Sequence, residues 1–207
     1  MSTNELIILV ADKAMKMMIQ GLLSRPQSLG IRPILDPYIR DYEYRDSGCY
    51  KHSHEFLRPF VNQYGYALVM FDRDFDKKRD LSAAELEAEV KERLDQNGWK
   101  DRCEVVVIDP ELESWVWSGS PCVEEILKWS GASTDLKSWL IGQGKWNVYS
   151  KKPEDPKDAM EAAMRQKKVK KSSSLFKDIG ERSKLDTCSD RAFLKFKQVL
   201  QNWFPQP

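Results

Sequence analysis

The chain has 207 residues, of which 41% are hydrophobic and 31% are charged. This composition is typical of a folded globular protein and excludes the disordered and collagen-like classes. The 33 basic and 32 acidic residues nearly balance, so the chain as a whole is not a polycation. No apolar run approaches the roughly 20 residues that cross a bilayer, which excludes a membrane protein.

The cysteines and the first residues predict a cytoplasmic location. The four cysteines are scattered and form no Cys-x-x-Cys pair, a pattern that favours reduced thiols over a disulfide framework. The chain starts without a basic segment or a small-residue cleavage site, so we expect no secretory signal.

The first third of the chain predicts strands and helices in alternation. Residues 6–10 are a continuous apolar run and predict a buried strand, and residues 13–23 carry apolar side chains at helical spacing. Residues 31–35 are expected to form a short second strand, which Pro33 confines to an edge or an end. Residues 36–50 are polar and rich in tyrosine, and we expect a loop there.

The next segment repeats the pattern. Residues 54–63 are expected to form a short helix, and the apolar run at 66–71 predicts a strand. After a charged loop, Ser82 and Glu85 have the spacing of a capping box and mark the start of an amphipathic helix. Residues 105–108 predict a last strand.

Beyond residue 121 we expect only helices, at residues 122–130, 135–141, 156–170 and 190–204. Short apolar runs separated by amphipathic helices indicate a parallel sheet that is buried on both faces, so the predicted fold class is α/β. We expect an α/β core over residues 1–120 and a helical C-terminal extension over residues 121–207, packed on that core. Residues 151–207 hold 14 basic and 8 acidic residues, a balance of +6, which leaves −5 for residues 1–150.

Acidic residues follow three of the predicted strands. They are Asp12, Asp72, Asp74, Asp76, Asp109, Glu111 and Glu113. The carboxyl ends of parallel strands meet at one edge of a sheet, where α/β proteins bind their ligands. Converging carboxylates repel one another unless a cation neutralises them, and Mg²⁺ or Mn²⁺ prefers such oxygen ligands. Each of these acids alone is also a common helix cap or turn residue, so a structural role stays open.

The order of these motifs resembles the Toprim fold of topoisomerases, bacterial primases and OLD-family nucleases. The stretch Asp109-Pro-Glu-Leu-Glu-Ser-Trp115 is similar to the Pro-Glu-x-Glu-x-Trp stretch of OLD-like and small stand-alone Toprim proteins. The tail, with Pro156-Lys157 opening a helix and Trp203-Phe204 closing one, resembles stand-alone Toprim-like proteins of bacterial defence islands. The openings Leu9-Val-Ala-Asp-Lys13 and Arg25-Pro-x-Ser-Leu-Gly-Ile-Arg32 resemble an accessory component of a methylation-associated phage-defence system.

The resemblance implies roles for individual residues. Asp72, Asp74, Glu111 and Glu113 match the acidic positions that bind Mg²⁺ or Mn²⁺, with Glu111 as the preferred ligand and as a catalytic residue. Toprim enzymes use a glutamate at the end of the first strand as general acid or base, and here Ala11 or Asp12 stands at that position. Asp12 is therefore the candidate for the catalytic role, and its shorter side chain leaves open that it only binds metal.

Basic and soft-ligand residues form weaker candidate sites. Lys13 is a candidate phosphate contact, and the run at residues 165–171 predicts a patch that binds the phosphate backbone or a merely solvated helix end. Its candidate nucleic-acid-binding residues are Lys167, Lys168, Lys170 and Lys171. Cys49, His52 and His54 could ligate zinc but lack a fourth ligand. The seven tryptophans are expected to pack in the core, with base stacking as the alternative.

Two hypotheses follow for a component of a bacterial anti-phage defence system. In the first, the acidic site holds a divalent metal that acts on nucleic-acid phosphodiesters, as in a nuclease. In the second, the chain is a non-catalytic Toprim-like scaffold whose acidic crevice and basic tail dock nucleic acid or other proteins of the same system.

Overall fold

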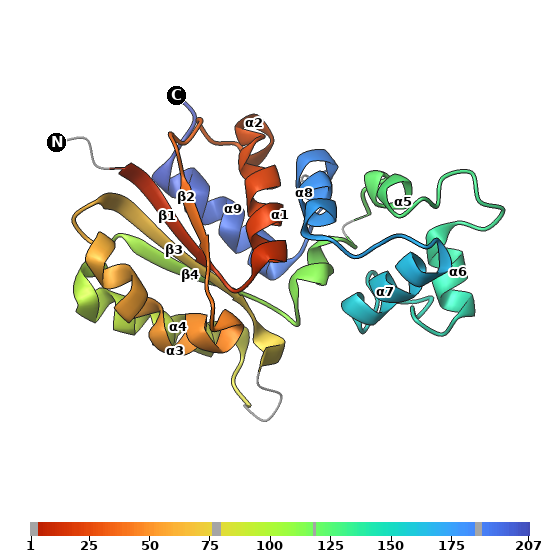
Figure 1. Cartoon of the computed structure of the whole chain (residues 1–207), viewed down its shortest axis with the longest axis horizontal. Coiled ribbons are helices and arrows are strands. Elements are labelled where there is room, and N and C mark those ends of the chain that lie inside the picture. The colour runs from red at the N-terminus through yellow and green to blue at the C-terminus, as the bar shows by residue number, and fades with distance from the viewer. Residues whose placement is uncertain (1–3, 76–79, 118, 185–187) are drawn as a thin grey trace.

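A computed structural model describes residues 4–75, 80–117, 119–184 and 188–207. At its centre lies a parallel sheet of four strands in the order β2-β1-β3-β4, with helices on both faces (Figure 1). The strands are β1 (Asn4–Val10), β2 (Tyr38–Asp41), β3 (Tyr64–Asp72) and β4 (Cys103–Ile108). The helices are α1 (Lys13–Leu23), α2 (Pro26–Leu29), α3 (Arg45–Leu57), α4 (Ala83–Leu94), α5 (Cys122–Ile126), α6 (Leu136–Gly142), α7 (Pro156–Gln166), α8 (Ser173–Arg182) and α9 (Arg191–Trp203).

The sheet forms because its inner strands are apolar on both faces. Residues 6–10 of β1 and 67–71 of β3 are completely buried, since α3 and α4 cover one face while α1 and α9 cover the other (Figure 1). A strand covered on both sides reads as a continuous apolar run without alternation. The α/β class with a parallel sheet, predicted from those runs, is confirmed.

The second strand and the helix after it differ from the expectation. The strand lies at Tyr38–Asp41 and not at residues 31–35, and α3 begins at Arg45, inside the segment expected as a loop. Within residues 31–35, where the strand was expected, Ile31 makes only an isolated antiparallel bridge to Pro205. An edge strand of four residues with two exposed side chains leaves no apolar run to detect.

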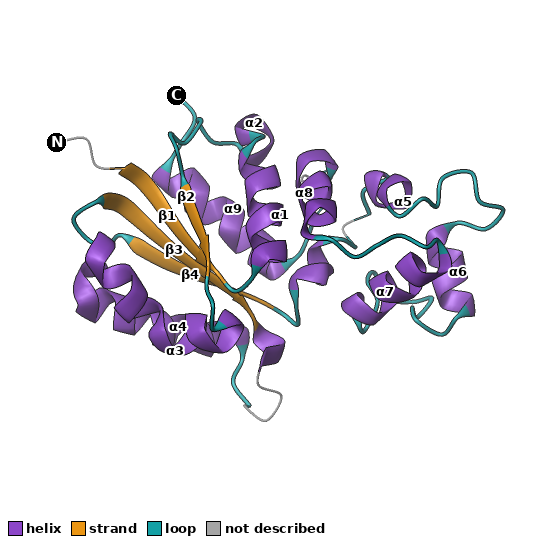
Figure 2. Cartoon of the chain, in the orientation of Figure 1, coloured by secondary structure: helices purple, strands orange, loops and turns teal. Residues whose placement is uncertain are grey.

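Helices α5, α6 and α7 form a lobe that projects beyond the carboxyl side of the sheet and contains no strand among the described residues (Figure 2). The chain then returns: α8 packs against α1, and α9 packs against β4 (Figure 1). Helix α7 ends at Gln166, before the expected residue 170, and α5 ends at Ile126, before residue 130. Helix α8 was not expected. Within the described residues, none of the helices is long and apolar enough to cross a membrane.

Helices α1 and α8 cross at two glycines that face each other. A Cβ atom on Gly21 would lie 2.4 Å from the Lys177 carbonyl oxygen, and one on Gly180 would lie 2.6 Å from the Met18 carbonyl oxygen. The obstacles are backbone atoms, which cannot turn aside as a flexible side chain can. The two helices therefore approach as closely as their backbones permit, and any side chain at either position forces them apart.

The variant Gly180→Ala is expected to lower the free energy of unfolding by about 1–3 kcal/mol, because the added methyl group overpacks this crossing. Urea denaturation followed by circular dichroism measures the change. Gly142→Ala is the matched control, since its Cβ would meet nothing within 4 Å. An equal loss in both variants would show that helix α8 does not depend on the close crossing.

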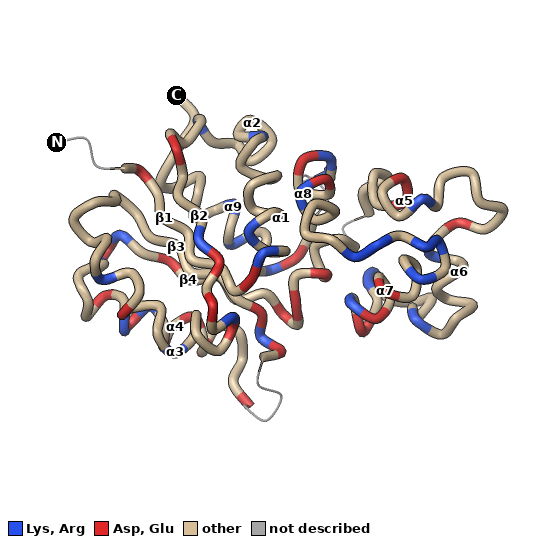
Figure 3. Tube along the Cα trace, viewed as in Figure 1, with Lys and Arg blue, Asp and Glu red and all other residues tan. Residues whose placement is uncertain are grey.

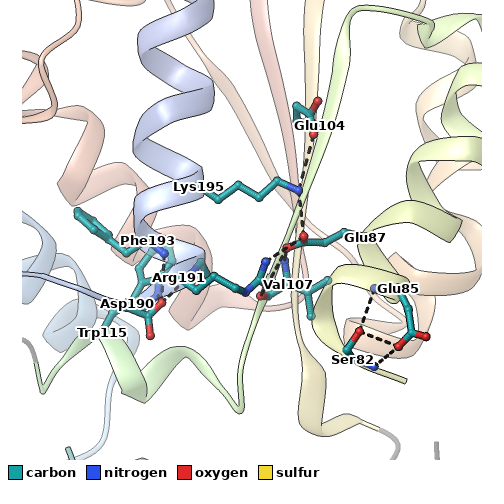
Figure 4. Close-up of polar contacts among 11 residues, drawn as sticks. Ser82, Glu85, Glu87, Glu104, Val107, Trp115, Asp190, Arg191, Phe193 and Lys195 are labelled. Carbon is teal, nitrogen blue, oxygen red and sulfur yellow. Dashed lines mark hydrogen bonds and ion pairs between the residues drawn. The ribbon is translucent and has the colours of Figure 1, made fainter. Parts of the chain in front are cut away.

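A buried carboxylate joins α4, β4 and α9 (Figure 4). Glu87 of α4 is 7% exposed; one carboxylate oxygen accepts from the Val107 N–H at 2.9 Å and from Arg191 at 2.9 Å. The other accepts from Lys195 at 2.9 Å. Burial alone raises the pKa of Glu87, but the bonds from Arg191, Val107 and Lys195 outweigh it and hold the pKa below its usual range. The carboxylate thus links helix α9 to β4, the outer strand on one side of the sheet.

Glu87→Ala is expected to cost about 1–3 kcal/mol, because it leaves the Val107 N–H without its acceptor and removes the carboxylate that Arg191 and Lys195 of α9 share. Since the folded-state pKa is lowered, this contribution is present at neutral pH and lost as the pH falls through that pKa. Denaturation at pH 7 and at pH 3 measures it, with Glu92→Ala on the exposed side of α4 as control. A difference that does not shrink in acid would contradict the ionic origin.

Candidate functional site

The carboxyl ends of β1, β3 and β4 bring acidic residues to one edge of the sheet (Figure 3). The pairing sets Val10 beside Met70 and Asp72 beside Ile108, so the residues that follow these strands leave the sheet at neighbouring points. Asp12 follows β1, Asp72 ends β3, and Glu111 and Glu113 follow β4. The predicted edge location of these acids follows from the parallel register.

Asp72 is half-buried, whereas Glu113 is the most buried of these acids. The Oδ1 atom of Asp72 is shielded from solvent and has no hydrogen-bond partner among the described residues. Burial raises the pKa of Asp72 well above its usual range, and the charges of Asp46, Glu113 and Asp12 raise it further. A carboxylate in this position is costly as an anion, and a nearby cation would relieve the cost.

Asp46 was not predicted as a site residue. It lies in the first turn of α3, where its Oδ1 accepts the backbone N–H of Asp72 at 2.9 Å. Burial raises its pKa, against the opposing effect of that N–H, and the charge of Asp12 adds to the increase. The residue before it, Arg45, has a φ of 50°, an unusual backbone for a side chain of that size. Only recognition of α3 in the polar segment could have drawn attention to Asp46.

Asp12 and Asp74 make local contacts at this edge. Asp12 caps α1 by accepting the Met15 N–H at 2.9 Å, which is the ordinary structural role of an acid after a strand. The backbone N–H of Asp74 donates to the Pro110 carbonyl at 3.1 Å and ties the segment after β3 to the segment after β4. Lys13 is exposed at the first turn of α1. Asp76 lies outside the described residues.

Lysines from the helical lobe and its return segment face the two glutamates. Glu111 accepts the backbone N–H of Lys157 at 3.0 Å, and its other oxygen lies 3.7 Å from the Lys157 ammonium. Glu113 is 8% exposed and lies 3.8 Å from the ammonium of Lys171. Burial is the main cause that raises the pKa of both glutamates, and the lysines act in the opposite direction. We call the acids at the carboxyl ends of the strands (Asp12, Asp46, Asp72, Glu111 and Glu113) the acidic edge. The acidic edge therefore already has basic side chains beside it.

The four predicted lysines fall on the turn and loop between α7 and α8, which carries the blue run in Figure 3. Lys168 and Lys170 line an open groove of about 490 Å³ together with Arg165 and Lys171. Lys167 lies over the Trp129 ring, 4.5 Å from its centroid. Through Lys171 this groove reaches the acidic edge.

A divalent cation fits this edge in the chemistry of its donors, since carboxylate oxygens are the ligands that Mg²⁺ prefers. The Oδ1 atom of Asp72, which has no hydrogen-bond partner among the described residues, is available as one such ligand. As the side chains stand, no three His, Cys, Asp or Glu residues of the described chain are close enough together to hold a metal ion. This applies equally to the Cys49, His52 and His54 group.

Comparisons with known proteins identify the fold. No protein-family model matches the sequence, and the curated proteins give no match. Among solved structures, the chain is similar to the C-terminal region of the Burkholderia pseudomallei OLD protein, with a TM-score of 0.56 and 12% identity. The similarity covers 95% of this chain and 97% of that one. The chain therefore has an OLD-like, Toprim-like α/β fold with a helical C-terminal region, as the motif order predicts.

Asp72→Asn is expected to stabilise the metal-free protein by about 0.5–2 kcal/mol at neutral pH, because it removes a buried charge among like charges. The folded-state pKa of Asp72 is raised, so its ionisation destabilises the fold as the pH rises, and the gain should disappear in acid. Denaturation in a chelator at about pH 3.5, below the pKa of an unfolded aspartate, and at about pH 8 tests this, with Asp178→Asn on the surface of α8 as control. A destabilised Asp72→Asn would contradict the electrostatic account.

Proposed function

We propose that this chain is a component of a bacterial anti-phage defence system that binds Mg²⁺ or Mn²⁺ at its acidic edge and acts on nucleic-acid phosphodiesters. The observation that carries the metal site is the buried, unpartnered oxygen of Asp72 among the charges of Asp46, Glu113 and Asp12. The motif resemblance supports the defence role, and the OLD-like fold supports nucleic-acid chemistry.

In this proposal the principal metal ligands are Asp72, Glu111 and Glu113, and Asp74 is a further ligand. The Asp46 carboxylate positions Asp72 by accepting its backbone N–H. A bound divalent ion would polarise a phosphodiester and neutralise charge on its oxygens. Asp12 is the candidate proton acceptor. The lysine groove would hold the phosphate backbone on the side of Lys171, so that a strand could reach the acidic edge.

One observation favours the alternative of a non-catalytic scaffold. Lys157 and Lys171 already lie beside Glu111 and Glu113, and the acids do not converge to metal-binding distance. Because these lysines offset the negative charge of the two glutamates, the protein needs no bound ion at the acidic edge to remain folded. In that case the acidic edge and the basic loop would serve as docking surfaces for partners.

Nuclease assays on plasmid and single-stranded DNA with Mg²⁺ or Mn²⁺ separate the two. The proposal predicts cleavage by the wild-type chain that falls on the order of 100-fold in the variant with Asp72→Ala and Glu111→Ala, as expected when metal ligands are removed. A melting-temperature increase on adding Mn²⁺ should be lost in the same variant.

The control variant is Asp178→Asn, which leaves the acidic edge intact and should retain both properties. A folded wild-type chain with neither cleavage nor a metal-dependent melting shift would overturn the catalytic proposal and favour the scaffold. Metal-dependent melting without cleavage would retain the metal site and exclude the nuclease activity on these substrates.

A further inference from the structure

The helical lobe contains a cavity that shares no lining residue with the lysine groove. This cavity of about 320 Å³ opens where the segment after β4 meets α5 and α6. Its walls are apolar and include Trp117, Val123, Leu136 and Trp146. This volume is at the lower end of the range for small-molecule sites and suits one ring system rather than a folded segment.

The two tryptophans form an aromatic corner in this cavity. Their ring centroids lie 5.4 Å apart and the ring planes make an angle of 78°. Both indole N–H groups are occupied, because Trp117 donates to the Pro156 carbonyl at 2.9 Å and Trp146 donates to the Ser150 carbonyl at 3.1 Å. The rings are thereby fixed and offer carbon surface to a ligand, which favours a planar aromatic group.

The cavity also has one charge of each sign. Lys137 is exposed, with its ammonium 5.2 Å from the centroid of the Trp146 ring, and Glu124 is half-buried. Neither has an ion-pair partner among the described residues. A ligand that combines a flat ring, an N–H donor and a phosphate would contact the rings, Glu124 and Lys137 respectively.

We propose that this cavity binds the base of a nucleotide, with the base against Trp146 and Trp117, an exocyclic amino group donating to Glu124, and the phosphate at Lys137. The choice of a nucleotide rests on the proposed nucleic-acid function. Two hydrogen bonds connect the cavity to the acidic edge, because Trp117 donates to the Pro156 carbonyl and the N–H of the next residue, Lys157, donates to Glu111. Glu124 accepts and does not donate, and the only donor that uracil offers, its N3–H, lies between two carbonyl oxygens that repel a carboxylate, so bases with an amino group bind better than uracil.

Equilibrium dialysis with AMP, CMP and UMP, in a chelator so that no metal is bound, tests the site. The expected result is binding of AMP and CMP that weakens about 10-fold in Trp146→Leu, in keeping with the loss of one base–aromatic stack. Trp139→Leu is the matched control, because Trp139 is a half-buried tryptophan of the same lobe that packs on Trp129 outside the cavity.

A second pair of variants tests the base preference. Glu124→Gln should abolish the preference for AMP and CMP over UMP. Glu125→Gln is the control and should keep that preference, because Glu125 pairs with Arg182.

The acidic-edge variant with Asp72→Ala and Glu111→Ala should bind AMP as well as the wild type does, so failure of the nuclease proposal does not decide this one. Competition by a short single-stranded DNA distinguishes a strand's base from a free nucleotide as the occupant. Absence of AMP and CMP binding at millimolar concentration, or equal weakening in Trp146→Leu and Trp139→Leu, would overturn the proposal. Binding of an apolar peptide without any nucleotide would assign the cavity to a protein partner instead.

Discussion

The parallel register of the sheet brings several acidic side chains close together and partly buries them, and the rest of the site depends on this arrangement. Asp72 cannot move away from Asp46, since its own backbone N–H is bonded to that carboxylate and its strand is paired on both sides. The two carboxyl groups therefore stay close together, and their repulsion is relieved either by a proton, which the raised pKa of Asp72 favours, or by a nearby positive charge. A chain keeps such an arrangement when a cation or a basic partner compensates it.

Two sources of compensation compete at this edge. Lys157 and Lys171 supply positive charge from the helical part, and a divalent ion would supply it from solution. An ion that bound to the glutamates would leave Lys157 free to interact with phosphate, while Lys171 would keep its ion pair with Glu161 at 2.8 Å. Metal binding and phosphate binding would in that way support each other, although the same carboxylates and lysines neutralise each other in the metal-free chain.

The sheet was predictable because burial on both faces leaves a strong signal. The runs at residues 6–10, 66–71 and 105–108 are strands, and the capping box at Ser82 and Glu85 begins α4. β2 and the first part of α3 were missed, while the helix expected at residues 54–63 corresponds to the end of α3 and the single turn at Arg58–Phe60. The edge strand is short and half-exposed, and the first part of α3 buries small or polar residues such as Gly48, Cys49 and Ser53. The location of the acids after three strands could be read from the sequence, but Asp46 could not, since it depends on the missed part of that helix. The lysines beside Glu111 and Glu113 depend on tertiary packing, which no local pattern records.

The return of the chain from the lobe has a consequence for how this fold can vary. The lobe leaves the sheet after β4 and returns into α8, whose glycine crossing with α1 anchors it again. The lobe is thus attached at both of its ends to the sheet and the helices packed on it, and the four strands of the sheet all precede the lobe in the chain. Replacing the lobe and its return segment would leave the strand pairing unchanged, but it would also remove Lys157 and Lys171 from beside Glu111 and Glu113, so the charge balance of the acidic edge would vary together with the lobe.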